Sequence, residues 1–186
     1  MKIFFDTEFT GLHKNTTLIS IGLVDEDCKT FYAEFSDYDK SQCNEWIEQN
    51  VLNNLLLGQY EHYGFYQDNT YCCGNKNFIK KHLTNWLSKY DKVELVSDVC
   101  HYDMVLFIDI FGDAFSIPQN VNPACHDINQ DIARYYEMSE TEAFDYSREQ
   151  ILDNCDIKIE GYKHNSLYDA KVIKEIYNVI KSHGLI

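Results

Sequence analysis

The chain opens with three runs whose apolar residues and β-branched or aromatic side chains are typical of strands. They cover residues 2–9, 16–24 and 29–36, and an acidic turn at residues 25–28 separates the second run from the third. Connections this short join antiparallel neighbours, because a parallel pair needs a crossover of about a dozen residues or more. The opening therefore predicts an antiparallel meander of three strands.

Helical spacing of apolar residues governs most of the remaining chain, with short strand-like runs between the helices. Helices are predicted for residues 41–57, ending at Gly58, and for residues 78–87, 102–111, 147–154 and 166–183. A short apolar run at residues 93–96 predicts a strand, and residues 124–136 predict a strand followed by a helix. The aromatic stretch from Gly58 to Gly74 shows little periodicity and predicts an irregular excursion. This order predicts an α/β fold, a mixed sheet flanked by helices, in one domain over residues 1–186.

The charge of the chain is strongly negative, with 30 Asp and Glu against 16 Lys and Arg and a formal net charge of −14. That balance argues against a protein that binds polyanions with a broad basic surface. It does not exclude a nucleic-acid enzyme, because carboxylates gathered in one site can hold divalent cations. If the ligand is a nucleic acid, we expect weak binding that covers only a few nucleotides.

Seven cysteines are scattered along the chain without a C-x-x-C pair. An odd number of cysteines in a chain of this size predicts reduced thiols, a cytoplasmic location and no structural zinc. There is no run of 18 apolar residues, and the amino terminus meets two acids early, so we expect a soluble protein without a membrane span or export signal.

Asp6 and Glu8 are the strongest local signal. On a strand they share one face with Phe4, while Ile3, Phe5 and Thr7 take the other. Two adjacent carboxylates repel each other, and a divalent cation between them would relieve that repulsion. Simple exposure of both acids at the strand end is the alternative. Asp-x-Glu-x-Thr is also similar to the Asp-x-Asp-x-Thr of aspartyl-phosphate phosphatases, but those enzymes have parallel sheets, which the meander disfavours.

Asp103 is a second acidic signal, placed in the first turn of the helix that follows residues 93–96. Asp98 lies nearer the end of that strand. Taken alone, both are explained as helix-start residues, where acids interact with unsatisfied amides.

His164 and Asp169 form a His-x4-Asp pair near the last helix. Five residues on a helix turn through about 140°, so the two could not share a face if both were helical, and His164 is placed in the preceding loop. The alternatives are a capping box of Ser166 with Asp169 and a surface-loop histidine.

In this order the motifs resemble those of the DEDDh 3′-to-5′ exonucleases, which have the ribonuclease H-like fold. DTEFTGL is close to the common DTETTGL of that family, Asp103 matches the second motif, and HNSLYDA is close to HNALxDA. The resemblance spans residues 3–180 and is greatest to small stand-alone bacterial and phage exoribonucleases. One departure is that Asp98 and Val99 stand where the second motif commonly has His-Asn. Several relatives form homodimers, so a homodimer is implied.

The resemblance implies a metal-dependent 3′-to-5′ exonuclease that acts on single-stranded nucleic acid, with RNA favoured over DNA. Two Mg²⁺ or Mn²⁺ ions about 3.5–4 Å apart would activate the water and stabilise the leaving oxygen. The implied ligands are Asp6, Glu8, Asp103 and Asp169, and the implied general base is His164. The implied contacts to the terminal nucleotide are Thr7, Phe9, Thr10 and Leu12. Further bases could stack on Tyr63, Phe65, Tyr66 and Tyr71, or these rings could pack beneath a loop.

Other functions remain as alternatives. A 3′-to-5′ DNA exonuclease of the same family would carry the same motifs. Endonucleases and resolvases on this fold lack the His-x4-Asp pair, so His164 disfavours them. A catalytically silent binding or scaffolding domain would be expected to lack a metal ligand, whereas all four carboxylates are present.

Overall fold

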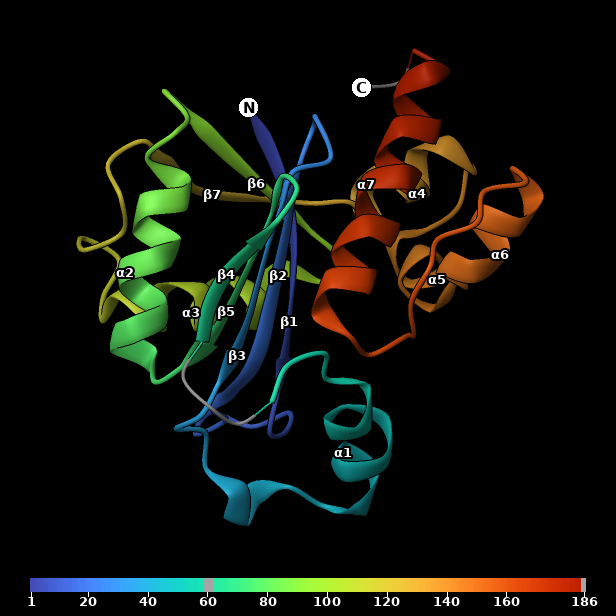
Figure 1. The fold of residues 1–186 in the computed structure, drawn as a ribbon. Coiled ribbons are helices and arrows are strands. Elements are labelled where there is room, and N and C mark those ends of the chain that lie inside the picture. The colour runs from blue at the N-terminus through green and yellow to red at the C-terminus, as the bar shows by residue number, and fades with distance from the viewer. Residues whose placement is uncertain (59–61, 185–186) are drawn as a thin grey trace.

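Seven strands form one mixed sheet in the computed structural model, which describes residues 1–58 and 62–184 (Figure 1). The order across the sheet is β4-β5-β3-β2-β1-β6-β7. Strands β1, β2 and β3 pair antiparallel, whereas β6 runs parallel to both β1 and β7, which confirms the predicted meander and mixed sheet. The strands are β1 (Lys2–Phe9), β2 (Leu18–Asp25), β3 (Thr30–Phe35), β4 (His62–Tyr66), β5 (Asn69–Gly74), β6 (Val93–Ser97) and β7 (Val121–Asp127).

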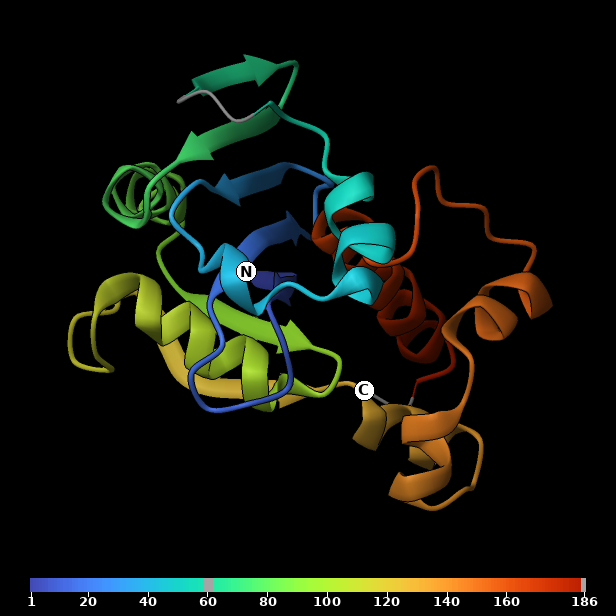
Figure 2. The ribbon, with the colours of Figure 1, turned by 90° about the horizontal axis from the view of Figure 1, so that it is seen from below.

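Helices cover both faces of the sheet (Figure 2). Helices α2 and α3 lie on one face, and α7 lies on the other with α4, α5 and α6 beside it (Figures 1 and 2). None of the helices in the described ranges is long and apolar enough to cross a bilayer. The helices are α1 (Glu45–Asn50), α2 (Lys76–Leu87), α3 (Cys100–Phe111), α4 (Asn129–Tyr135), α5 (Glu140–Asp145), α6 (Arg148–Asn154) and α7 (Ser166–Ser182).

Strand β1 is buried on both faces, and its alternation is the one predicted. Ile3 and Phe5 pack in the core beneath α2 and α3, whereas Phe4 packs in the core beneath α7. All three side chains are fully buried, and each stabilises the fold by about 1.5–3 kcal/mol relative to exposure. The two cores therefore fix the strand from both sides, just ahead of Asp6 and Glu8.

The prediction of one helix over residues 41–57 is wrong. The structure has a 3₁₀ turn at Lys40–Gln42, the short helix α1, and a second 3₁₀ turn at Leu52–Asn54. The Asn54 side chain donates to the carbonyls of Asn50, at 2.6 Å, and Lys163, at 2.9 Å. Asparagine amides compete in this way with helical backbone bonds, which ends the helix early.

The prediction of an irregular excursion over residues 58–74 is also wrong for the part that the structure describes. Residues 62–74 form the hairpin of β4 and β5, and β5 pairs parallel to β3. Residues 59–61 lie outside the described residues. The hairpin escaped the prediction because Thr70 and Cys72, the small residues on either side of Tyr71, face the core while most of the rings stay outside.

The short helix α5 was not predicted, although a capping box of Ser139 with Glu142 marks its start. The predicted strand and helix over residues 124–136 appear as β7 and α4, and the predicted helices over residues 78–87, 102–111, 147–154 and 166–183 appear as α2, α3, α6 and α7. These helices have an apolar stripe that packs on a core, which is the condition under which periodicity predicts well.

Gly22 of β2 allows α7 to begin directly on the sheet. Gly22 lies opposite Asp6 in the β1–β2 register. A Cβ at this position would come within 2.4 Å of the backbone of Ser166 and Leu167. The hydroxyls of Ser20 and Ser166 share a hydrogen bond of 2.8 Å across the same contact. Small residues on this face of β2 thus bring the first turn of α7, which carries Asp169, next to Asp6.

We expect Gly22→Ala to lower the free energy of unfolding by about 1–3 kcal/mol, because the added methyl group must displace the backbone at the start of α7. Urea denaturation measures the effect. Gly58→Ala is the matched control, since a Cβ there meets nothing within 4 Å. Equal stability of the Gly22→Ala variant and the wild type would contradict the close approach.

Candidate active site

Three elements bring the four predicted metal ligands together beside the carboxyl-terminal half of β1, an interior strand of the sheet. Asp6 and Glu8 lie near the end of β1, Asp103 in the first turn of α3, and Asp169 in the first turn of α7. Asp6, Glu8 and Asp169 line a cavity of about 580 Å³, which His164 also lines. Asp103 lies behind it and is only 4% exposed. The structure therefore brings together all five residues predicted to be catalytic.

Asp103 is held in place by the strands beside it. The backbone N–H and hydroxyl of Thr7 donate to its Oδ1 at 3.1 and 2.5 Å, and the Ser97 hydroxyl donates to its Oδ2. Thr7 faces away from Asp6 and Glu8 on β1, which is what allows it to reach α3. The threonine in the Asp-Thr-Glu motif thus orients the third carboxylate.

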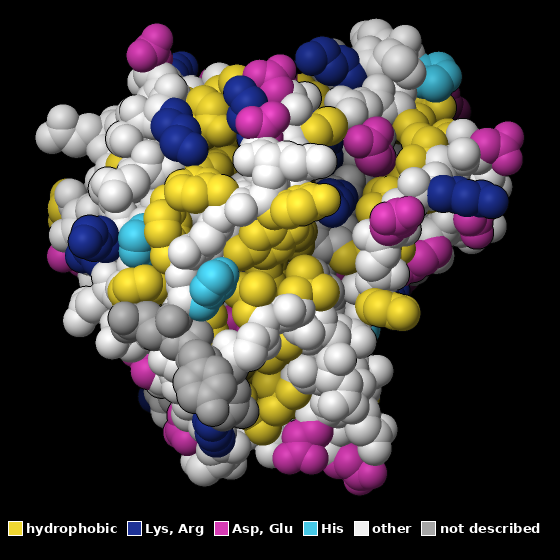
Figure 3. All heavy atoms as spheres, viewed as in Figure 1, with side chains coloured by type: hydrophobic (Ala, Val, Ile, Leu, Met, Phe, Trp, Pro, Cys, Tyr) yellow, Lys and Arg dark blue, Asp and Glu magenta, His cyan; other side chains and the backbone are white. Residues whose placement is uncertain are grey.

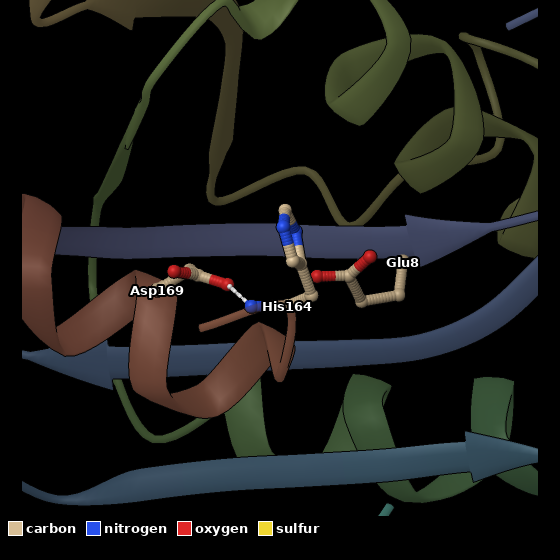
Figure 4. A group of neighbouring side chains, drawn as sticks. All are labelled: Glu8, His164 and Asp169. Carbon is tan, nitrogen blue, oxygen red and sulfur yellow. Dashed lines mark hydrogen bonds between the residues drawn. The ribbon is translucent and has the colours of Figure 1, made fainter. Parts of the chain in front are cut away.

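The loop before α7 orients His164 toward Glu8 and Asp169. Asp169 Oδ2 accepts the backbone N–H of His164 at 2.9 Å, and His164 has a φ of 63°, in the left-handed region. One ligand atom each of Glu8, His164 and Asp169 lies within 4.8 Å of the others (Figure 4). A non-glycine residue in this conformation is strained, so the surrounding bonds must hold it.

Asn165 provides much of that support and caps α7 in place of the predicted alternative, a capping box of Ser166 with Asp169. Its Oδ1 accepts the backbone N–H groups of Leu167 and Tyr168. Its Nδ2 donates to the Asn54 carbonyl at 2.8 Å and the Tyr32 hydroxyl at 3.2 Å. The residue after His164 is therefore tied to the segment that follows α1.

Burial raises the pKa of every carboxyl in the cluster, and the charges of neighbouring carboxyls add to the shift. Burial, together with the charges of Asp103, Asp169 and Glu8, raises the pKa of Asp6 well above its ordinary value. Burial raises the pKa of Glu8 to about 9, with Asp169 and Asp103 adding to the shift. Burial also raises the pKa values of Asp103 and Asp169 to about 7, against the hydrogen bonds that each accepts.

This set of donors fits divalent cations. Carboxylate oxygens are the protein ligands that Mg²⁺ and Mn²⁺ prefer, and bound cations would remove the repulsion among these carboxylates. Within residues 1–58 and 62–184, no Lys, Arg or His side chain forms an ion pair with Asp6, Glu8, Asp103 or Asp169. The charge that balances this cluster must therefore come from outside the chain.

Arg148 and Asp98 form a second charged group beside the cavity. Arg148 Nε donates to Asp98 Oδ2 at 2.6 Å, and its NH2 group donates to Asp98 Oδ1 at 2.8 Å and to Asn129 Oδ1. Its NH1 group donates to the carbonyls of Ala143 and Tyr146. All five N–H bonds of Arg148 are thereby used, so it fixes the end of α5 against Asp98. The resemblance had left the role of Asp98 unassigned.

Trp46 is a cavity residue that the sequence pattern indicated only as one of the apolar residues of the helix predicted over residues 41–57. It is 51% exposed, lines the cavity, and meets the His164 ring edge to face at 5.0 Å between centroids. Its spacing with Ile47 and Val51 suggested a buried helical stripe, but the helix is too short to bury both sides. Phe144 of α5, which is 55% exposed, also lines the cavity and carried no sequence signal.

The four predicted nucleotide contacts are placed differently. Thr7, Phe9 and Leu12 line the cavity. Leu12 is 79% exposed, and Phe9 stacks on Tyr102 at 5.2 Å. Thr10 is buried instead, and its hydroxyl donates to Gln42 at 2.5 Å, so the structure does not bring it to the cavity.

Without divalent cations, we expect the free energy of unfolding to fall as pH rises between about 4 and about 7. Asp103 and Asp169 have pKa values near 7 when folded and near 4 when unfolded. Protonation therefore favours the folded state, and that stability is lost as pH rises through the folded pKa. Urea titrations in EDTA across this range measure it. Asp103→Asn should flatten the slope, and an equal slope in both proteins would contradict the shifted pKa.

Comparison with solved structures shows the same fold in several nucleases. The nuclease domain of 3′hExo, a DEDDh family member bound to rAMP, has a TM-score of 0.64 and 14% identity, over 99% of this chain and 92% of that one. S. pombe Pop2p with Mg²⁺ and Mn²⁺ bound has a TM-score of 0.59 and 16% identity, over 97% and 82%. A 3′-exonuclease in a structure of histone mRNA stem-loop recognition has a TM-score of 0.61, and this chain covers 63% of it.

Sequence comparison gives the family. The 3′-5′ exoribonuclease Rv2179c of Mycobacterium tuberculosis strain H37Rv is 27% identical over 132 residues, which are 70% of this chain and 73% of that protein. The model of the 3′-5′ exoribonuclease Rv2179c-like domain matches residues 1–181. The chain therefore belongs to the Rv2179c-like 3′-5′ exoribonuclease family and is a 3′-to-5′ exonuclease with a ribonuclease H-like fold.

Proposed function

We propose that this protein removes nucleotides one at a time from the 3′ end of single-stranded RNA, with residues 1–186 acting as one exonuclease domain. The observation that carries the proposal is the meeting of Asp6, Glu8, Asp169 and His164 in one cavity, with Asp103 behind them. The name of the M. tuberculosis relative, an exoribonuclease, supports RNA as the substrate.

Asp6, Glu8, Asp103 and Asp169 would hold two Mg²⁺ or Mn²⁺ ions in this reaction. Bound there, the ions would lower the pKa of the attacking water and neutralise charge on the phosphate and the leaving 3′ oxygen. Pop2p has been solved with both of these ions, which supports the choice. Thr7 and Ser97 contribute by holding the Asp103 carboxylate in one orientation, since each donates a hydrogen bond to it.

His164 would act as the general base that accepts the proton of the attacking water. Burial, and then the charge of Lys163, lowers the pKa of His164, so its ring is neutral at pH 7 and can accept a proton. The Trp46 ring and the backbone bond to Asp169 restrict where the imidazole lies. A base fixed in this way needs little rearrangement at the moment of reaction.

The terminal nucleotide would occupy the cavity between exposed apolar side chains. Leu12 and Trp46 offer surfaces for a base, and each is more than half exposed. Lys163 and Arg148 are the cations that line the cavity in the described ranges. Because the N–H groups of Arg148 are all engaged, Lys163 is the residue available for a phosphate, and it must release Glu149, which it meets at 3.2 Å.

Two further properties stay predictions from the sequence. A cytoplasmic location rests on the cysteines, and among the described residues these form no disulfide. A homodimer rests on the resemblance to the exonuclease family.

We expect 5′-labelled single-stranded RNA to be shortened from its 3′ end in Mg²⁺ or Mn²⁺, faster than matched DNA, and to stay intact in EDTA. Asp6→Asn should abolish the ladder, because it removes a ligand oxygen charge from the cluster. His164→Asn should slow single-turnover cleavage by about 10²–10⁴-fold, the contribution of a general base.

Lys158→Ala, a change at an exposed loop residue outside the cavity, serves as the control and should leave the rate unchanged. Degradation that persists in EDTA, or cleavage within an RNA whose 3′ end is blocked, would contradict the proposal.

A further inference from the structure

A continuous row of aromatic rings lies along the outer edge of the sheet, outside the catalytic cavity. The Phe65 and Tyr63 rings of β4 are 4.9 Å apart between centroids, and Tyr63 stacks on His82 of α2 at 3.7 Å. His82 in turn meets Phe78 at 4.6 Å. Phe65 is 62% exposed and Tyr63 is 37% exposed. The row therefore presents ring surface to solvent beside α2.

The helix beside these rings is basic, in contrast to the chain as a whole. Residues 76–90 contain four lysines and no Asp or Glu, although the net charge of the protein is −14. Lys76 pairs with Asp109 and Lys80 donates to the Phe111 carbonyl. Lys81 and Lys89 are exposed and make no ion pair within residues 1–58 and 62–184. Lys81 lies three residues after Phe78 on α2, on the neighbouring part of the helical surface, and Lys89 lies just beyond the end of α2 at Leu87.

Rings and ammonium groups meet at a hollow beside Phe65. The hollow has a volume of about 320 Å³, and Phe65, Lys29 and Lys89 line it together with one carboxylate, Asp68. Figure 3 shows hydrophobic side chains beside Lys or Arg groups and histidines over α2 and the hairpin. A base that stacks on Phe65 would place its phosphate within reach of either lysine.

We propose that this surface binds the 5′ part of a single-stranded RNA whose 3′ end lies in the catalytic cavity. We call it the edge platform, and it consists of Tyr63, Phe65, Phe78, Lys81, His82 and Lys89. The inference rests on the proposed function, because it needs a polymer that reaches the cavity. Aromatic rings flanked by basic groups are the combination with which proteins bind single strands without sequence preference. An acidic ligand is favoured because the lysines supply unpaired positive charge.

The position of the edge platform sets the length of RNA that can use it. Strand β4 lies four strands away from β1, a lateral distance of about 19 Å at about 4.8 Å per strand. Tyr63 and Phe65 are in register with Thr7 and Phe5, on the face opposite to Asp6 and Glu8, so the RNA must also pass from one face of the sheet to the other. At about 3.4 Å per nucleotide the lateral distance alone corresponds to about six nucleotides. We expect RNA of two or three nucleotides to occupy the catalytic cavity alone. RNA long enough to span the distance is expected to bind the cavity and the edge platform together. The negative net charge alone predicted a footprint of only a few nucleotides.

The test compares kcat and KM for oligoadenylates of about 3 and about 15 nucleotides, lengths on either side of the bridging distance. Phe65→Ala, and separately the pair Lys81→Glu with Lys89→Glu, should raise KM for the longer RNA by about fivefold or more, the effect of one lost base stack. KM for the short RNA and kcat for both should stay at the wild-type values. Lys181→Glu, at the exposed end of α7, is the matched charge control and should leave both KM values unchanged.

An unchanged KM for the longer RNA in both variants would overturn the edge platform, and so would an equal rise of KM for both lengths. If the variants change the molecular mass in light scattering but not KM, the surface pairs two copies of the chain and the inference is wrong. Failure of the wild type to degrade either RNA would instead refute the proposed function. Fluorescence anisotropy of Asp6→Asn with 3′-blocked RNA then tests the edge platform alone, and equal affinity with and without Phe65→Ala would refute it.

Discussion

Mutual repulsion among four carboxylates is the constraint around which this protein is organised. Asp6, Glu8, Asp103 and Asp169 come from three separate elements, and burial and proximity raise the pKa of each. A chain gains no stability from such a cluster by itself, because each ionised group is both desolvated and repelled. The arrangement is stable in its ionised form only when cations bind, and a pair of divalent cations is also what phosphodiester hydrolysis requires.

The fold holds the cluster by fixing its elements through contacts on their other sides. Strand β1 is buried on both faces, so Asp6 and Glu8 project from a backbone that cannot easily move. The contact of Gly22 with the start of α7 brings Asp169 to the same place from a position 163 residues later in the chain. Asp103 is oriented by hydroxyl groups of the two neighbouring strands. The apolar contacts work at any state of charge of the cluster, whereas the hydrogen bonds to Asp103 favour its ionised form.

Much of the site could be predicted because its residues lie in or next to a strand and a helix whose apolar residues follow a regular spacing. The alternation of β1 predicts which face carries Asp6 and Glu8, and helix rotation predicts that His164 precedes α7. Trp46 was not predicted at the site because its spacing fits the apolar stripe of a longer helix, and only the early end of α1 exposes it. Thr10 was expected at the nucleotide, yet its hydroxyl is engaged by Gln42, which is distant in sequence. Contacts between distant segments, such as Arg148 with Asp98, leave no local pattern to read.

The charge of the protein is unevenly distributed. The carboxylates gather at the proposed metal site, whereas the unpaired lysines lie on the surface that we propose for RNA.

The most direct measurement of the central claim is calorimetric titration of Mn²⁺ into the metal-free protein, at about pH 6 and about pH 8, in buffers of different ionisation enthalpy. Because the carboxyls have raised pKa values, Mn²⁺ must displace protons from them. The account predicts binding with more protons released at the lower pH, and fewer protons released in Asp169→Asn than in the wild type. Absence of Mn²⁺ binding, or binding without proton release at either pH, would contradict it.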